Sequence, residues 1–221
     1  MKYFDEKVTT TIGIKNVTKM VIVYQIKDYT IFVGVDQFEN EDLIKYSVKY
    51  MEELGDKLIW FHVEKFSSPH AYIKLHEGET TIPPNLIQIC CQICKDGSIK
   101  GCKEPTVEVV YCESINLSKT GCQNPGQVTF KDPSKNKYIK GVKKNNMILN
   151  MLAKIKGSTT LEEMNKELQD LVVAKRNAKK AAMKKEKEEI EQKARDEKQA
   201  KYDMLNGMTQ AEGVMDEDDF M

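Results

Sequence analysis

Residues 59–75 read IWFHVEKFSSPHAYIKL and contain two short apolar runs separated by a polar turn. β-Branched and aromatic residues fill both runs, and a Ser-Ser-Pro sequence lies between them, which is typical of a strand, a turn and a second strand. Because side chains alternate along a strand, Trp60 and His62 face one side of the sheet and Phe61 faces the other. This stretch therefore predicts two adjacent strands with large side chains on both faces.

The flanking sequence extends this pair into a mixed α/β domain. Runs of β-branched and aromatic residues predict more strands, and apolar residues at three- and four-residue steps predict helices. The prolines at 83 and 84 suit the first turn of a helix. Expected strands are 21–26, 30–33, 58–63, 71–75, 106–111, 127–130 and 138–142, and expected helices are 40–54, 84–96 and 145–155.

The charges of the chain are balanced in total but unevenly distributed. The 34 Lys and Arg residues match the 34 Asp and Glu residues, so the net charge is zero. Residues 175–201 hold 11 basic and 6 acidic side chains, whereas residues 202–221 hold 6 acidic and no basic ones. A zero total argues against a protein that works by bulk positive charge, although a local basic segment is present.

A long helix is predicted after residue 157. Thr160 and Glu163 have capping-box spacing, so the helix is expected to begin there. Leu161, Met164, Leu168 and Leu171 then follow the spacing of a coiled-coil seam, which fails further along. The remaining charged stretch suits either a solvated helix or a helix that becomes ordered on a partner.

The face of the strand pair that carries Trp60 is a candidate recognition surface. Aromatic rings stack on bases, while hydroxyl and amine groups contact phosphate and sugar oxygens. The alternative is that Trp60 belongs to the core and that both histidines are structural. The candidate residues on this surface are Trp60, His62, Ser68, His70, Tyr72 and Lys74.

Two other patterns of residues are candidates for metal binding or catalysis. Asn40, Glu41 and Asp42 suit a metal or acid–base cluster, but a helix N-terminus capped by Asn40, with the acids favouring its positive end, is the simpler interpretation. Cys91 and Cys94 form one C-x-x-C pair without the second pair of a structural zinc site, so we expect core thiols, with zinc or redox chemistry as the alternative. The sequence has no hydrolase nucleophile, P-loop or dinucleotide motif, and we expect no catalysis, metal or cofactor.

The basic segment beyond residue 174 is a second candidate contact surface. Cations four residues apart lie on one face of a helix, where they suit a phosphate backbone. The alternative is an ordinary solubilising face. The candidate residues are Lys175, Arg176, Lys179, Lys180 and Lys184.

Several motifs in order resemble the NFACT-R domain family over about residues 29–155. The resemblance implies an RNA-binding domain of a kind that also occurs in ribosome quality-control factors. Asn40 and Asp42 match the family's N-x-D element, Trp60 and His62 its W-F-H element, and Ser68 and His70 its S-x-H element. Further matching stretches are NLSK at 116–119 and GQV at 126–128.

Together these observations predict the fold class α+β. We expect an NFACT-R-like domain over 1–156, with 1–28 as a divergent extension, then a long charged helix over 157–206 that is a possible coiled coil, and a disordered acidic tail over 207–221. The start of the chain does not have the pattern of a signal peptide, and the longest uncharged run, 80–94, is shorter than a membrane span of about 18 residues.

The expected function is non-enzymatic RNA binding, with ribosomal or transfer RNA and ribosomes or translation factors as partners. The expected location is the cytoplasm, with the nucleus as a further compartment. Two alternatives stay open: a coiled-coil module in which the helix after Leu161 docks on a protein partner, and a DNA-binding sensor at a membrane.

Overall fold

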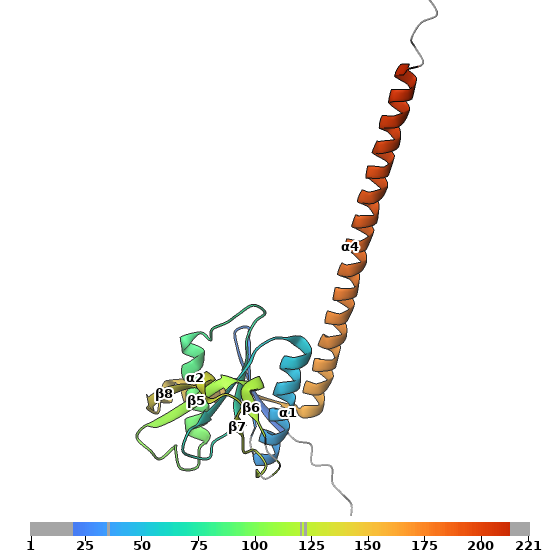
Figure 1. Cartoon of the computed structure of the whole chain (residues 1–221). Coiled ribbons are helices and arrows are strands. Elements are labelled where there is room, and N and C mark those ends of the chain that lie inside the picture. Colours follow the sequence, from blue (N-terminus) through green and yellow to red (C-terminus); the bar gives the residue numbers. More distant parts are fainter. Residues whose placement is uncertain (1–19, 35, 120, 122, 213–221) are drawn as a thin grey trace, which may run out of the picture. The chain divides into compact units, whose positions relative to one another are not determined.

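The computed structural model of the chain describes residues 20–34, 36–119, 121 and 123–212. It divides into a first compact unit that ends at Gln169 and a second that begins at Asp170. Figure 1 shows the order of the elements. They are β1 (Met20–Ile26), β2 (Tyr29–Val33), α1 (Gln37–Leu54), β3 (Leu58–Val63), β4 (Ala71–Lys74), α2 (Pro84–Gly97), β5 (Val107–Glu113), η1 (Ser114–Asn116), β6 (Leu117–Ser118), β7 (Thr129–Phe130), η2 (Pro133–Lys135), β8 (Lys137–Val142), α3 (Asn146–Ile155), β9 (Lys156–Thr160) and α4 (Leu161–Glu212).

A seven-stranded antiparallel sheet organises the first unit. Its strand order is β8-β5-β3-β4-β2-β1-β9, and β6 and β7 form a separate small sheet. The pair predicted from residues 59–75 forms as expected, because β3 and β4 pair with Trp60 opposite Tyr72. This antiparallel sheet and the helices around it confirm the fold class α+β.

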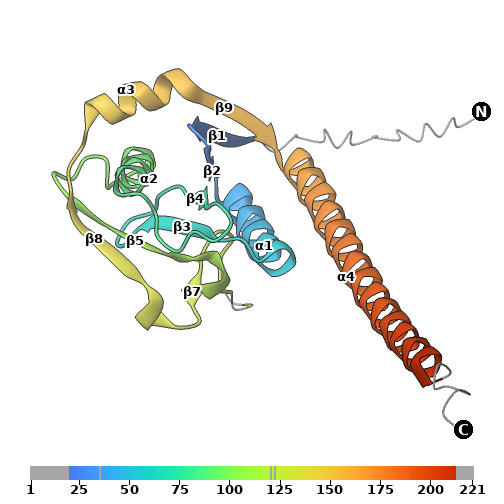
Figure 2. The same cartoon turned by 90° about the horizontal axis from the view of Figure 1, so that it is seen from above.

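One face of the sheet packs against α2. Phe61 and Val63 of β3 point to this face and belong to the main hydrophobic core. Figure 2 shows the chain passing from β8 through α3 to β9 on the outer side of α2, so this helix is enclosed. Enclosure explains why α2 is apolar around most of its circumference. Its buried residues are Leu86, Ile89, Cys90, Cys91, Gln92, Ile93, Cys94 and Lys95.

The enclosed position of α2 confirms the expectation of core thiols. Cys91 and Cys94 are both buried, and burial raises the pKa of the Cys91 thiol to about 12. Burial also raises the pKa of the Cys94 thiol. A protonated, buried thiol is a poor nucleophile and a poor metal ligand, so these two side chains act as small apolar groups.

The opposite face of the sheet packs against α1. The rings of Phe32 on β2 and Tyr46 on α1 meet edge to face, with centroids 6.3 Å apart. Lys74 on β4 lies with its Nζ 5.0 Å from the centre of the Tyr50 ring on the same helix. Both faces of the sheet are therefore covered by a helix, and Figure 2 shows α1 and α2 on opposite sides of it.

The N-terminus of α1 differs from the sequence prediction. Asp36 is the N-cap, and its Oδ1 accepts hydrogen bonds from the backbone N–H groups of Phe38 and Glu39, each at 2.8 Å. Asn40 and Asp42 lie inside the helix, so the prediction that Asn40 caps it is wrong. The buried Asn40 amide instead accepts a hydrogen bond from the backbone N–H of His70 at 3.3 Å. It thereby ties α1 to the start of β4.

The first folded unit extends beyond residue 156, the predicted end of the NFACT-R-like domain. β9 pairs with β1, and Met164 and Leu168 of α4 are buried, so two of the four expected seam residues pack within the first unit. Thr160 and Glu163 form the predicted capping box, with reciprocal hydrogen bonds of 3.0 and 3.1 Å. The helix continues to Glu212 rather than 206. Most of the expected acidic tail and residues 1–19 of the expected extension lie outside the described residues.

None of the helices over the described ranges has the length and apolar character needed to cross a membrane.

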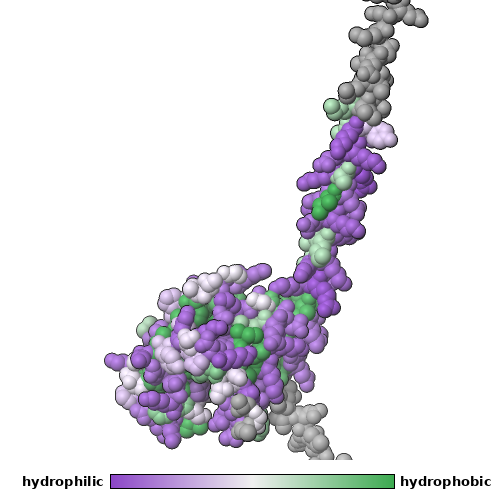
Figure 3. All heavy atoms as spheres, in the orientation of Figure 1, coloured by the Kyte–Doolittle hydropathy of each residue, from purple (hydrophilic) through white to green (hydrophobic). Residues whose placement is uncertain are grey.

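The second unit is the part of α4 that begins at Asp170. Figure 3 shows it covered mainly by hydrophilic side chains, with single hydrophobic residues between them. Such a surface fits the solvated charged helix that the sequence predicts.

Replacement of Gly34 by Ala is expected to destabilise the protein by roughly 1–3 kcal/mol. A Cβ at this position lies 2.3 Å from Asn40 Oδ1, so it displaces the amide from the His70 N–H. The matched control is Gly157→Ala in β9, where the added Cβ has Val23 O at an ordinary 3.5 Å. Chemical denaturation measures both variants. Equal stability of the two would contradict the tie between α1 and β4.

Candidate nucleic-acid interface

The structure brings the predicted surface residues to one face but buries most of them. Trp60 and Tyr72 are each 1% exposed and His70 is 3% exposed, so these three side chains belong to the interior. Lys74 lies on the same face, against Tyr50 of α1. Direct stacking of a base on the Trp60 ring is therefore excluded in this conformation, and the part of the prediction that made this ring an open platform is wrong.

Ser68 is structural as well. Its Oγ accepts a hydrogen bond from the backbone N–H of Val63 at 3.0 Å and donates one to the carbonyl of Pro69 at 3.1 Å. These bonds close the turn between β3 and β4. This turn places His70 directly before β4, where the His70 side chain faces Trp60 and His62.

Three rings form a compact cluster under this turn. Trp60 and His62 are stacked, with centroids 5.5 Å apart and planes 5° apart. The His70 ring stands perpendicular to both, at 5.2 Å from Trp60 and 5.1 Å from His62. Phe130 of β7 also meets Trp60 edge to face, at 5.8 Å. His62 is the only partly exposed ring among the three in the cluster, so it is the one that a ligand can contact.

Both histidines of the cluster are neutral near pH 7. Burial lowers the pKa of His62 to about 4. Burial, together with the nearby His62 ring, lowers the pKa of His70 to about 3. Neutral imidazoles offer no cation to a phosphate group. They do offer hydrogen-bonding nitrogen atoms and a flat ring surface.

Two polar atoms of the cluster lack a partner. Neither Trp60 Nε1 nor His70 Nδ1 has a hydrogen-bond partner among the residues that the structure describes. A buried polar group without a hydrogen bond costs roughly 1–3 kcal/mol. Such an arrangement is uncommon in a folded protein unless a bound group can satisfy it.

An open cleft of about 1080 Å³ lies over the cluster. The first turn of α1, the turn between β3 and β4, and residues 123–128 form its walls, with Trp60, His62 and His70 among the lining side chains. Asp36, Glu64 and Lys65 are the lining residues that carry full charges. Two carboxylates against one amine make the cleft better suited to an uncharged planar group than to a phosphate.

Glu41 fixes the wall made by residues 123–128. Its carboxylate pairs with Lys119 and accepts a hydrogen bond from the backbone N–H of Gly126 at 3.2 Å. Gly126 has a φ of +78°, and a Cβ there would lie 3.0 Å from the carbonyl oxygen of Gln37. The Glu41 anchor was not identified from the sequence, because the partners lie more than 75 positions along the chain. The available signal was that Glu41 lies within the N-x-D element and its partner Lys119 within the NLSK stretch.

The predicted cations of α4 form a separate group in the second unit. Residues 171–185 contain six cations and no acidic residue. Lys175, Arg176, Lys179, Lys180 and Lys184 are all exposed. Lys184 pairs with Glu188 at 3.6 Å across one helical turn, a solvent-exposed contact that is worth little. This group can contact phosphate by charge alone.

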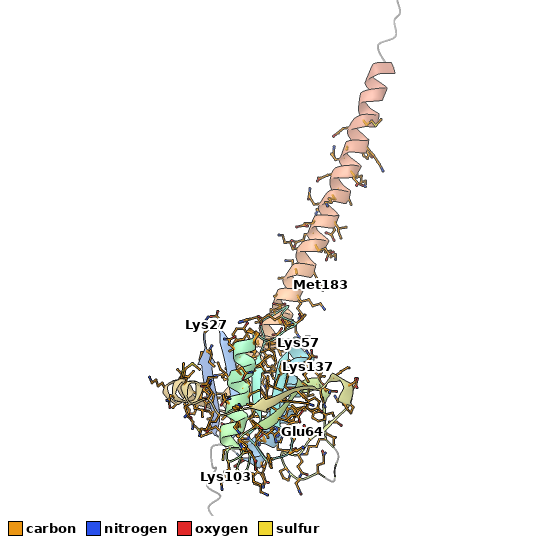
Figure 4. The ribbon with its side chains drawn as sticks, turned by 90° about the vertical axis from the view of Figure 1, so that its left-hand side faces the viewer. Lys27, Lys57, Glu64, Lys103, Lys137 and Met183 are labelled. Carbon is orange, nitrogen blue, oxygen red and sulfur yellow. The ribbon has the colours of Figure 1, made fainter. Side chains whose placement is uncertain are left out.

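Sequence reasoning missed a third group, at the end of the sheet. We name residues 131–144 the basic edge, because this segment contains β8 and holds six lysines against one acidic residue. All six lysines are exposed. Figure 4 shows Lys137 of this edge on the side of the domain that also carries Glu64, away from Lys27. The signal was the local lysine density, which the zero net charge of the whole chain concealed. The basic-edge lysines are Lys131, Lys135, Lys137, Lys140, Lys143 and Lys144.

An antiparallel sheet enclosed by helices, with a cleft lined by neutral rings and with exposed lysines, defines an α+β binding domain. A family model described as the NFACT protein RNA binding domain matches residues 19–132. The chain belongs to this family, and the membership supports RNA binding as its general function. The cleft and the start of the basic edge lie within the matched range.

Named relatives span most of the chain. It is similar to coiled-coil domain-containing protein 25 of Bos taurus, with 39% identity over 203 residues, 87% of this chain and 93% of the relative. A Dictyostelium discoideum homolog of that protein is 39% identical over 150 residues, 66% of this chain and 69% of the relative. Protein JLP2 of Saccharomyces cerevisiae is 40% identical over 129 residues, 57% and 60% of the two chains.

The neutral histidines predict that the protein loses stability on acidification. Between pH 6.5 and about 4 the unfolded chain takes up protons at His62 and His70 that the folded chain does not bind. The contribution of these two histidines to stability is therefore nearly constant above pH 7 and falls by roughly 5 kcal/mol by pH 4.5, since each of the two protons contributes about 1.4 kcal/mol per pH unit below pH 6.5. Denaturation at several pH values measures this slope. NMR titration checks whether the two histidines cause this slope. An imidazole of His62 or His70 that titrates near pH 6.5 in the folded protein would contradict that origin.

Proposed function

We propose that this protein binds RNA in the translation apparatus, without catalysing a reaction on it. The RNA is ribosomal or transfer RNA, and the protein associates with ribosomes in the cytoplasm. Membership of the NFACT protein RNA binding domain family is the observation that carries the proposal. The geometry supplies two contact surfaces of different chemistry that fit it.

The cleft over the Trp60–His62–His70 cluster supplies the uncharged contacts. Its neutral rings and its two unpartnered nitrogen atoms suit the planar, hydrogen-bonding edge of an unpaired base. Because Trp60 Nε1 and His70 Nδ1 are covered, a base contacts His62 first and reaches the other two after a small side-chain movement. This mode of contact depends on single-stranded rather than duplex RNA, because bases in a duplex are paired and stacked.

The cations of α4 supply contacts to phosphate. Their exposed, closely spaced charges attract the RNA backbone without reading its sequence. Downstream of Lys185 the lysines alternate with acidic residues, and Lys185 and Lys187 pair with Glu189 and Glu191 at 3.9 and 3.7 Å. The positive field is therefore strongest over residues 171–185. The same charges also attract DNA, so the comparison with DNA belongs in the test.

The change Lys175/Lys179/Lys180/Lys184→Gln is expected to weaken RNA binding and to lower its dependence on salt. Each lost phosphate contact reduces the slope of log affinity against log salt by about 0.7 for a single strand, so four contacts reduce it by about 3. Fluorescence anisotropy of the full chain with a labelled single-stranded RNA measures this. The matched control is Lys193/Arg195/Lys198/Lys201→Gln on the same helix, for which we expect a change below 1.

Ribosome association is tested by sedimentation of the full chain with ribosomes through sucrose, at low and high salt. We expect co-sedimentation at low salt that high salt releases. Absence of the protein from the ribosome fraction at low salt would contradict the ribosomal part of the proposal. Tighter binding to DNA than to RNA of the same sequence would overturn the RNA part.

A further inference from the structure

The basic edge is held in place by two buried side-chain amides. Near its beginning, Asn116 Nδ2 donates to the Asp132 carbonyl at 2.9 Å, and Asn116 Oδ1 accepts from the Asp132 N–H at 2.9 Å. Near its end, Gln92 Nε2 donates to the Lys143 carbonyl at 2.8 Å, and Gln92 Oε1 accepts from the Asn145 N–H at 2.8 Å. Both amides are nearly fully buried, so the lysines project from a fixed backbone.

An aromatic ring lies in the middle of these lysines. Tyr138 is 43% exposed, between Lys137 and Lys140 on β8. It pairs with Val110 on β5, which pairs with His62 on β3, so Tyr138 and His62 lie on the same face of the sheet. Two strand spacings separate them, which is about 10 Å. The ring therefore lies near the cleft and on the same side as it.

The positive charge of the basic edge is only loosely compensated. Lys140 and Glu108 are 3.9 Å apart, Lys135 and Asp132 3.8 Å, and Lys144 and Asp96 3.3 Å, and the lysine of each pair is exposed. Lys131 and Lys143 form no ion pair within the described parts of the chain, whereas Lys137 lies on the α2 side of the sheet with its Nζ 6.0 Å from the centre of the Tyr111 ring. Cations in this state are available to an external anion.

Protection of the sheet edge does not account for this segment. Lysines on an edge strand discourage pairing with another chain, and one or two inward or central charges are enough for that purpose. Here six lysines extend through the strand and the turns on both sides of it, with an exposed aromatic ring among them. Fixing the ends with buried amides adds nothing to solubility, whereas it reduces the ordering cost of binding.

We propose that the basic edge is a binding site for single-stranded RNA, with phosphates on its lysines and one base stacked on Tyr138. The RNA strand follows β8 and brings a neighbouring nucleotide to the cleft beside His62. The inference rests on the proposed RNA-binding function and adds the place at which a single strand binds outside the cleft. Alternating cations and an aromatic ring are the combination by which proteins bind single strands without strict sequence preference.

The experiment compares variants of the full chain in anisotropy titrations with a labelled single-stranded RNA and with an RNA hairpin duplex. Lys135/Lys140/Lys143→Gln removes three cations of the basic edge, and Lys27/Lys49/Lys103→Gln removes three exposed lysines elsewhere on the first unit. We expect the first variant to lower the salt slope by about 2, and the second to leave the affinity within twofold.

The contribution of stacking is measured with Tyr138→Ala and Tyr138→Phe. Loss of one base–aromatic stack weakens binding about 5- to 100-fold, and phenylalanine, which keeps the ring, retains wild-type affinity within about threefold. Circular dichroism and melting temperature establish that each variant is folded.

The possible failures are separate. Wild-type protein that binds no RNA at low salt contradicts the proposed function itself. Wild-type binding that both lysine variants weaken equally overturns the basic edge as the site. A Tyr138→Phe variant as weak as Tyr138→Ala overturns stacking, and equal affinity for the duplex overturns the single-strand assignment.

Discussion

The alternation of side chains along β3 is the constraint on which the rest of this structure depends. β3 is the third strand from the β8 edge, and it sends Phe61 and Val63 toward α2 and Trp60 and His62 toward the opposite face. α1 covers part of that opposite face, and the helix begins after its N-cap, Asp36. His62 lies where this cover stops, so the one partly exposed position of β3 is also the floor of the cleft.

Side-chain amides then fix the parts that the sheet itself does not hold. Asn40 ties α1 to the residue before β4, and Asn116 and Gln92 hold the two ends of the basic edge. Each amide is buried and replaces a backbone partner that regular secondary structure would supply, which is how buried polar groups are normally satisfied. The cleft and the basic edge are therefore preformed surfaces, although they consist largely of turns and an edge strand.

Local patterns predicted most of the elements, whereas long-range pairing decided what was missed. The hairpin of β1 and β2, the β3–β4 pair, α2 and the Thr160–Glu163 capping box follow from spacing alone. Asn40 was misassigned because Asp36 begins the helix one turn earlier. β9 has few apolar residues and forms by pairing with a strand more than 100 residues away, which no local pattern reveals. Strand alternation predicted that Trp60 and His62 lie on the same face of β3. It did not predict that α1 covers this face and buries Trp60.

In the proposed complex, RNA runs along one face of the first unit, from the basic edge to the cleft. Ultraviolet crosslinking of the full chain to single-stranded RNA that contains 4-thiouridine, followed by mass spectrometry of the crosslinked peptides, tests it most directly. The proposed path of the RNA predicts crosslinks in residues 131–144, including Tyr138, and at His62. Crosslinks confined to residues 175–201, with none in the first unit, would contradict it.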